Sequence, residues 1–321
     1  MKYAALFPGQ GCQYKKMCES LYQSDGDFRG IINKASDILG YDLWDMICNS
    51  KMSVFTKSEN AQPAVTTVTY ALYRNFLKLC SDLPSIAFGH SLGEISAIIC
   101  AESISFEDGI SFIQKRGKLM SEISEKKLGF CGIAIDITQE HLVEIINTIS
   151  TSHYVAITGY NSTNQFMIGG EYGAESLLDD CVSKCGGQYI PYKMIPMKVN
   201  APYHSRLMEE FKPMIHKMLE SISFHKPVFP IISTVSGKLI KESSEISGLL
   251  EEQLVNPVLW NQTITLLKDM NLDAVIDIGP GKIMKNLVLE TYSMPNIFTL
   301  DNNDERTILK NKLKAEGGHY E

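Results

Sequence analysis

The chain has 321 residues, of which 44% are hydrophobic and 21% charged, and its formal net charge is −7 at pH 7. This length allows a large core, arranged as one large domain or as a large and a small one. The acidic balance argues against nucleic acid as the main partner.

No apolar run approaches the roughly 18 residues of a membrane span, and the run at residues 3–7 is too short for a signal peptide. The eight cysteines include no C-x-x-C pair. Cys181 and Cys185 are four residues apart, but no cluster of His or Cys completes a zinc site around them. The pattern predicts reduced, buried thiols in a cytoplasmic protein without a metal site or a membrane partner.

The N-terminal part of the chain predicts strands and helices in alternation, as in an α/β fold. A buried strand over residues 3–7 leads into a loop rich in Gly and Gln, and helical segments continue to about residue 80. The longest helix among them, residues 61–79, has apolar side chains at three-to-four spacing. A short strand over 84–88 follows, and then helices over 92–101 and 106–124.

The next segment changes pattern to strand, helix, strand, strand, helix, strand, which is ferredoxin-like and needs about 65 residues. We therefore expect a small subdomain, residues 128–193, inserted into a large subdomain made of residues 1–127 and 194–321. The predicted strands of the insertion are 130–135, 154–158, 165–168 and 188–192, and its helices are 139–149 and 174–184. The chain then returns to a strand over 274–278, a helix over 283–289 and a polar tail from Asn302.

The pentapeptide Gly89-His90-Ser91-Leu92-Gly93 lies where the strand over 84–88 turns into a helix. A strand–turn–helix setting separates a nucleophile elbow from a chance Gly-x-Ser-x-Gly match. At the start of a helix, N–H groups can stabilise negative charge next to Ser91. The motif predicts acyl transfer through a covalent ester of Ser91.

A serine hydroxyl needs a base, and His204 is the candidate among seven histidines. It follows Pro202 in a segment with little helical character, and a proline-set loop can aim a side chain into a cleft. A structural loop histidine is the alternative interpretation. His90, inside the elbow, is expected to point off the other side of the turn from Ser91. The remaining candidates, His141, His216 and His225, have polar helical or pre-proline surroundings typical of the surface.

No acid between Ser91 and His204 follows a convincing core strand, as the usual order of a hydrolase triad requires. Asp277 follows a strand but comes after His204, and a structural role is favoured for it. We therefore expect a dyad in which a carbonyl holds the imidazole tautomer.

Two further segments are suggestive. The turn Phe7-Pro8-Gly9-Gln10-Gly11 directly follows the first strand, and its N–H groups could complete an oxyanion hole with that of Leu92. The run Lys115-Arg116-Gly117-Lys118 is most simply a solvated helix face. If Arg116 points inward, it could instead bind a carboxylate in a bidentate manner.

Together these segments resemble the malonyl-CoA:acyl carrier protein transacylases, including the acyltransferases of polyketide assembly lines. The resemblance runs nearly end to end and rests on motifs in sequence order, none of them specific alone. They are Phe7-Pro8-Gly9-Gln10-Gly11, a Gln62-Pro63-Ala64 turn with Thr67, Gly89-His90-Ser91-Leu92-Gly93-Glu94, Arg116-Gly117-Lys118, Ala201-Pro202-Tyr203-His204-Ser205, Asn256-Pro257-Val258 with Trp260, and Gly279-Pro280-Gly281.

The resemblance implies an α/β-hydrolase-like large subdomain and a ferredoxin-like small one. It implies a Ser91–His204 dyad, with Arg116 on the free carboxylate of a malonyl group. The expected oxyanion N–H groups belong to Gln10 and Leu92, and the carbonyl of Gln253 would orient His204. The substrate pocket is expected to include Gln62, His90, Tyr203 and Asn161.

The implied reaction moves malonyl from CoA to Ser91 and then to the phosphopantetheine thiol of an acyl carrier protein, without a metal or other cofactor. A monomer is expected. Because the family's carrier proteins are acidic and this chain is acidic too, docking would need a local basic patch. Its candidate residues are Lys184, Lys193, Lys198 and Arg206.

Two positions depart from the family pattern. Cys12 stands where serine is usual. Tyr203 stands where the fatty-acid enzymes tend to have serine and malonyl-specific polyketide enzymes phenylalanine. The aromatic ring favours a discrete, trans-acting polyketide-type enzyme and should disfavour an α-methyl group on the substrate. The hydroxyl of Tyr203 leaves an unusual extender, hydroxy- or aminomalonyl, open as an alternative.

Two rival functions share the expected fold. An editing acyl hydrolase would tend to lack the carboxylate-binding arginine, so Arg116 argues against it. A non-catalytic interaction protein should have lost Ser91, His204 or Arg116, and all three are present.

Overall fold

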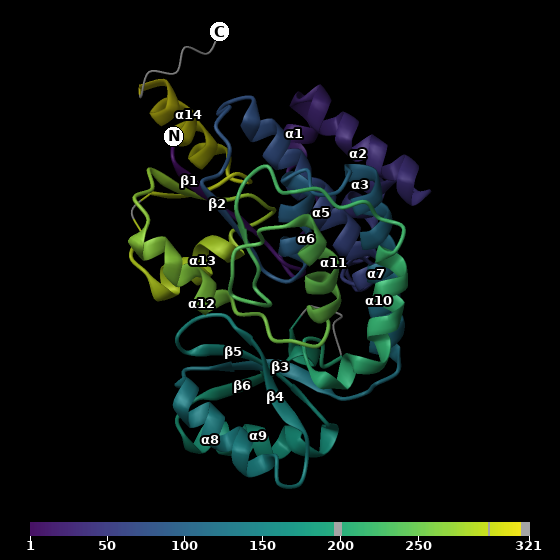
Figure 1. Ribbon diagram of the computed structural model, residues 1–321, viewed down its shortest axis with the longest axis vertical. Coiled ribbons are helices and arrows are strands. Elements are labelled where there is room, and N and C mark those ends of the chain that lie inside the picture. The colour runs from purple at the N-terminus through teal and green to yellow at the C-terminus, as the bar shows by residue number, and fades with distance from the viewer. Residues whose placement is uncertain (196–200, 295, 316–321) are drawn as a thin grey trace.

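The structure is a computed structural model, which describes residues 1–195, 201–294 and 296–315. Its larger part is built on a parallel five-stranded sheet with the strand order β7-β2-β1-β8-β9 (Figure 1). The central strands carry short apolar runs, as strands buried on both faces do. The strands are β1 (Tyr3–Phe7), β2 (Ile86–Gly89), β7 (Ile231–Ile232), β8 (Ala274–Asp277) and β9 (Ile297–Thr299).

The two faces of this sheet belong to two separate hydrophobic cores. Alternate residues of β1 divide between them: Ala5 and Phe7 join the larger core, and Ala4 and Leu6 join the smaller one. This follows from the period of two along a strand. The sheet is therefore covered by helices on both sides.

Most helices of the larger part contribute to the larger core. They are α1 (Glu19–Ser24), α2 (Gly26–Leu39), α3 (Leu43–Asn49), α4 (Met52–Phe55), α5 (Ser58–Leu77), α6 (Leu92–Cys100), α7 (Phe106–Glu125), α10 (Lys212–Leu219), α11 (Ser243–Glu252) and α14 (Asn303–Ala315). The smaller core is closed by α12 (Trp260–Ile264) and α13 (Ile283–Thr291). Single 3-10 turns lie at Tyr192–Met194, Arg206–Phe211 and Thr265–Asp269.

The helix predicted over residues 61–79 begins earlier, at Ser58, so Gln62-Pro63-Ala64, a turn in the family motif, lies inside α5. Pro63 lacks the N–H that would bond to the carbonyl four residues earlier. The helix nevertheless continues, because most of its length is buried and packs against α7. Tertiary packing thus overrides the local signal of the proline, and Gln62 gains a fixed place on a rigid element.

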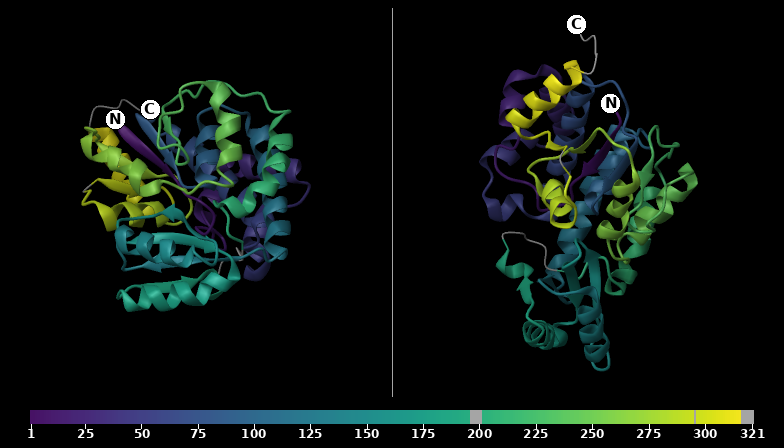
Figure 2. Two further views of the ribbon diagram at one scale, coloured as in Figure 1. Left: turned by 60° about the horizontal axis from the view of Figure 1, so that its bottom comes forward. Right: turned by 90° about the vertical axis from the view of Figure 1, so that its left-hand side faces the viewer.

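The smaller part confirms the predicted ferredoxin-like order. Its antiparallel sheet has the strand order β4-β5-β3-β6, and its helices cover the face that points away from the larger part (Figures 1 and 2). The elements are β3 (Phe130–Ile135), α8 (Gln139–Ile149), β4 (Val155–Tyr160), β5 (Gln165–Gly170), α9 (Tyr172–Lys184) and β6 (Gln188–Pro191). A third hydrophobic core lies between this sheet and its two helices.

A short stretch of backbone pairing joins the two parts. The N–H of Tyr160 donates to the carbonyl of Val258 at 2.9 Å, and the N–H of Val258 donates to the carbonyl of Thr158 at 3.0 Å. Strand β4 of the smaller part is thereby fixed to the segment that follows α11.

The C-terminal segment differs from its prediction. The polar tail from Asn302 forms α14, whose Leu309 and Leu313 are buried. Its buried apolar stripe is narrow and most of its other positions are polar or charged, so composition alone hid the helix. Among the helices of the described residues, none has the length and apolar character required to cross a membrane.

The contact of α6 with β1 allows only glycine at residue 93. A Cβ atom there would lie 1.9 Å from the carbonyl oxygen of Phe7, which belongs to the backbone and has no room to move. We expect Gly93→Ala to lower the free energy of unfolding by about 3 kcal/mol, measured by urea denaturation.

The matched control is Gly248→Ala, also within a helix, where a Cβ atom would meet nothing within 4 Å. Alanine there should raise stability by about 0.5 to 1 kcal/mol. Equal unfolding free energies for the two variants would contradict the close approach of α6 to β1.

Candidate active site

The structure has the strand–turn–helix geometry that the sequence predicted around Ser91. Strand β2 ends at Gly89, α6 begins at Leu92, and Ser91 between them has φ 51° and ψ −108°. Such a backbone conformation is unfavourable for a residue with a side chain and persists only where the surroundings impose it. A Cβ atom at Gly89 would lie 2.2 Å from the amide nitrogen of Glu94, so the turn closes only around a glycine.

Ser91 and His204 lie within hydrogen-bond reach. The distance from Ser91 Oγ to His204 Nε2 is 2.9 Å, and His204 Nδ1 lies 2.6 Å from the carbonyl oxygen of Gln253. A carbonyl oxygen only accepts, so the proton of the neutral ring sits on Nδ1. Nε2 is then the acceptor that faces the serine hydroxyl. The arrangement is the dyad that the sequence led us to expect, with a carbonyl where a triad has its acid.

The segment after α11 holds His204 by its backbone as well. His204 has φ 62°, and its N–H donates to the carbonyl of Leu254 at 2.9 Å. Both partners of the dyad therefore have a left-handed backbone that neighbouring segments impose.

Burial, together with the positive charge of Arg116, lowers the pKa of His204 to about 3. Both effects disfavour a charged imidazole. The ring is therefore neutral at pH 7, with its one proton on Nδ1, and Nε2 is available as a base.

The other sequence candidates lie elsewhere. Asp277 is buried at the end of β8 and accepts from the backbone N–H of Lys285 at 3.0 Å, in keeping with the favoured structural role. Burial raises its pKa to about 8. His216 is exposed and bonds to Glu251, while His141 and His225 are exposed as well.

A narrow cavity of about 80 Å³ opens beside the dyad and is lined from both parts of the molecule. Gln10, Leu92, Gln62, Arg116 and Tyr203 all line it, as the resemblance implied. His90 lines it too, as the resemblance implied, and not on the far side of the turn from Ser91, where the motif alone had placed it. Asn161 is not among the lining residues; its Oδ1 lies 3.0 Å from His90 Nε2, one contact behind the wall. The smaller part supplies Cys131, Thr158 and Met167, which the sequence did not single out. No local motif marks these three, because they meet the dyad only through the packing of the two parts.

The turn after β1 and the start of α6 face this cavity through Gln10 and Leu92. Among the described residues, no hydrogen bond uses the backbone N–H of either one. The first N–H groups of a helix lack partners within the helix. Two free donors next to Ser91 could stabilise the oxyanion of a tetrahedral intermediate.

Arg116 is buried, and the expected solvated face holds only for its neighbours Lys115 and Lys118, which are exposed. The reason is close packing: a Cβ at Gly117 would lie 2.6 Å from the carbonyl oxygen of Ser58. This contact presses α7 onto α5 and turns Arg116 inward. Its Nη1 donates to Gln62 Oε1 at 2.8 Å and its Nη2 to Gln253 Oε1 at 3.1 Å.

Both acceptors of the Arg116 guanidinium are neutral amides, so its charge is not compensated there. No ion pair joins it to a carboxylate among the residues that the structure describes. Burial lowers the pKa of Arg116 to about 10, which still leaves a cation at pH 7. A buried cation without an anionic partner, facing a cavity, is suited to binding a ligand carboxylate.

Tyr203 closes the cavity between Arg116 and β3. Its ring is buried, and its hydroxyl donates to the backbone carbonyl of Met120 on α7. The hydroxyl proton is thus engaged by the protein rather than directed at a substrate.

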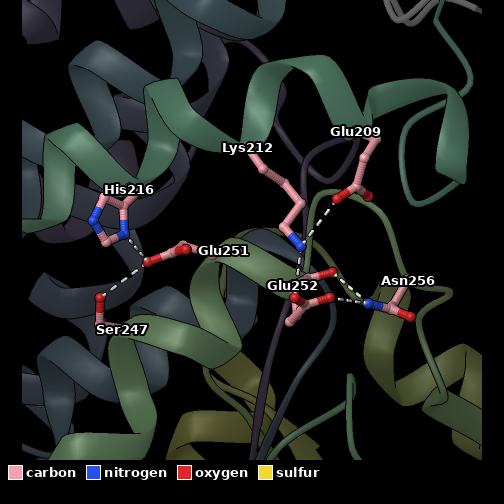
Figure 3. A network of polar contacts seen from close by, with 7 residues as sticks. All are labelled: Glu209, Lys212, His216, Ser247, Glu251, Glu252 and Asn256. Atoms are coloured by element: carbon pink, nitrogen blue, oxygen red, sulfur yellow. Dashed lines mark hydrogen bonds and ion pairs between the residues drawn. The ribbon is translucent and has the colours of Figure 1, made fainter.

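A polar network between α10 and α11 holds the end of α11 in place (Figure 3). Lys212 Nζ lies 2.7 Å from Glu252, and the side-chain amide of Asn256 donates to the carbonyl and the carboxylate of Glu252 at 3.0 and 2.8 Å. One turn further along α10, His216 Nδ1 lies 2.7 Å from Glu251. The network fixes the turn that presents Gln253 and Leu254 to His204.

A serine with a neutral histidine base, two free N–H donors and a buried cation defines a serine acyltransferase or hydrolase acting on an acyl group that carries a carboxylate. The comparisons with known proteins specify the class. The family described as "Acyl transferase domain" matches residues 5–311, and the chain belongs to it. Within that family the chain is a member of the malonyl-CoA:acyl carrier protein transacylases.

Several relatives support this assignment. The chain is 32% identical over 311 residues to the malonyl CoA-acyl carrier protein transacylase of Buchnera aphidicola, covering 96% of this chain and 97% of that protein. The Escherichia coli K12 protein of that name is 28% identical, over 89% and 91% of the two chains. The crystal structure of FabD from Acinetobacter baumannii superposes with a TM-score of 0.90 at 27% identity, covering 98% and 99%.

A second solved structure shows a relative with a partner. It is a malonyl-transacylase in complex with a type II polyketide acyl carrier protein, and it matches with a TM-score of 0.90 at 28% identity, covering 97% of this chain and all of that chain.

The depressed pKa of His204 has a measurable consequence. Because a lowered pKa keeps the imidazole unprotonated down to low pH, modification of Ser91 by a neutral fluorophosphonate should keep a constant rate from pH 8 to about pH 5. The rate is followed by intact mass at each pH. A rate that falls with an apparent pKa near 6.5 would show that His204 is solvated, against the structure.

Proposed function

We propose that this chain transfers a malonyl group from CoA to the phosphopantetheine thiol of an acyl carrier protein through an ester of Ser91. The observation that carries the proposal is the uncompensated, buried guanidinium of Arg116 in the same cavity as the Ser91–His204 pair. The names of the relatives support the same donor and acceptor.

The first half-reaction makes the ester. His204 Nε2 takes the proton of Ser91 Oγ as the oxygen attacks the thioester carbon, and the N–H groups of Gln10 and Leu92 receive the developing oxyanion. When the tetrahedral intermediate collapses, the C–S bond breaks and the thiolate of CoA takes the proton from His204.

The second half-reaction reverses these steps with another thiol. The phosphopantetheine thiol gives its proton to His204 and attacks the ester carbonyl. The ester C–O bond breaks, and Ser91 Oγ recovers the proton from His204. No cofactor takes part in either half.

Arg116 and Tyr203 support malonyl over the alternatives. A free carboxylate can accept hydrogen bonds from the Arg116 guanidinium. An editing hydrolase of neutral acyl groups would have no use for such a cation, so Arg116 argues against that function. The bulk of Tyr203 opposes an α-substituent, and its hydroxyl proton is already given to Met120. A hydroxy- or aminomalonyl unit would therefore find no free donor at Tyr203. The aromatic ring also supports service to polyketide carrier proteins in trans.

We infer that the chain has two subdomains, residues 128–193 and the rest of the chain, and that the carrier protein reaches the cavity along their junction. We also infer that the protein acts as a monomer. Of the basic candidates, Arg206 joins the two parts, because its guanidinium lies over the ring of Tyr154 at 4.1 Å. Lys193 Nζ is 3.8 Å from Glu175, and Lys184 ends α9, which covers the far face of the smaller sheet. Lys198, the fourth candidate, lies outside the described residues.

The direct test is intact-mass spectrometry after brief mixing with malonyl-CoA and then with a phosphopantetheinylated carrier protein. We expect one malonyl adduct that maps to Ser91, is absent in Ser91→Ala, and moves to the carrier protein. An adduct that is released only to water would instead identify a hydrolase.

Replacing Arg116 distinguishes its role in binding the substrate carboxylate from the reactivity of Ser91. Arg116→Ala should lower the second-order rate of malonyl loading by about 100-fold or more, because it removes one partner of a buried ion pair. Fluorophosphonate labelling of Ser91, which needs no carboxylate contact, should change little. Unchanged malonyl loading would contradict the role of Arg116.

A further inference from the structure

Gln253 contacts the nucleophile, the base and the cation of the proposed site. Its backbone carbonyl accepts from His204 Nδ1 at 2.6 Å. Its side-chain Oε1 accepts from Arg116 Nη2 at 3.1 Å, and its Nε2 donates to the backbone carbonyl of Ser91 at 3.1 Å. The side chain is fully enclosed, so these contacts are made without competition from solvent.

Arg116 and the backbone carbonyl of Ser91 fix the orientation of the Gln253 amide, and the carboxyl group of Glu94 is a further hydrogen-bond neighbour of this side chain. Arg116 can only donate and the carbonyl of Ser91 can only accept, so the amide oxygen must face the guanidinium and the amide nitrogen must face the elbow. A residue with two acceptors or two donors at this place would leave one buried group unpaired or opposed, which costs free energy. Glutamine is the side chain of this length that satisfies both.

The amide also leaves the charge of Arg116 free. A guanidinium has five N–H donors, and the amides of Gln62 and Gln253 take one each. The other three have no hydrogen-bond acceptor among the described residues. A carboxylate in place of either amide would keep the hydrogen bond but would neutralise the cation before any substrate arrived.

We propose that the side chain of Gln253 is a positioning residue that determines specificity: it orients the Arg116 guanidinium without neutralising it and ties it to the Ser91 elbow. Its anchor is the end of α11, which Lys212, Glu252 and Asn256 hold in place (Figure 3). The inference deepens the proposed malonyl transfer and rests on it.

The test compares two substitutions at Gln253 on two reagents: malonyl-CoA loading followed by intact mass, and fluorophosphonate labelling, which reports on Ser91 and His204 alone. Gln253→Glu should lower the second-order rate of malonyl loading by about 100-fold or more, because a resident carboxylate pairs with Arg116. Gln253→Met, which keeps the volume and loses both side-chain bonds, should lower it by about tenfold. Labelling should fall by less than malonyl loading in both, since the backbone carbonyl that holds His204 remains.

Gln139→Glu is the charge-matched control, because Gln139 is exposed on α8, in the smaller part. It should match the wild type on both reagents. Malonyl loading within threefold of wild type in both Gln253 variants would overturn the inference, as would equal losses on the two reagents. A wild-type chain that reacts with the fluorophosphonate but not with malonyl-CoA would overturn the proposed function itself, and the inference with it.

Discussion

The site depends on keeping one cation and one neutral base buried side by side. In water, Arg116 and His204 would both be solvated and their charges screened, whereas in the cavity the field of the guanidinium acts directly on the imidazole and opposes its protonation. Neutral acceptors hold both groups: the backbone carbonyl of Gln253 holds the imidazole, and the side-chain amide oxygens of Gln62 and Gln253 hold the guanidinium. No acid is needed, and an acid at either place would cancel the charge that the site offers to a substrate.

Much of the fold could be predicted because its elements carry local signals. The ferredoxin-like insertion was predicted in the right order, since each strand and helix there shows its own periodicity and its turns lie between them. The two-residue β7 and three-residue β9 were not singled out, because strands this short have no period and exist only as neighbours of longer ones. The helix predicted over 61–79 was right in type but starts at Ser58, three residues earlier, because packing along α5 keeps Pro63 inside it.

The candidate site divides in the same way. Ser91 could be found from five contiguous residues, because the strained turn imposes glycines on both sides of it. His204 was one of two interpretations, since a loop histidine has no periodic signal and its partner carbonyl lies about fifty residues further along the chain. The sequence most simply predicted that Arg116 lies on a solvated helix face. The contact between α7 and α5 that turns it inward cannot be recognised from the pattern of charges. The wall from the smaller part has no sequence signature, as it arises only from how the two sheets meet.

That meeting has a mechanical consequence. Strand β4 and the segment after α11 share two backbone hydrogen bonds at Val258. These bonds join the wall of the cavity that carries Thr158 to the turn that holds His204. A hinge that opened the junction at this seam would have to break both bonds and would carry the imidazole away from the serine. The cavity beside Ser91 therefore has a rigid wall on this side. An acyl group too wide for the cavity could gain room on this side only by breaking these bonds, which would separate His204 from Ser91.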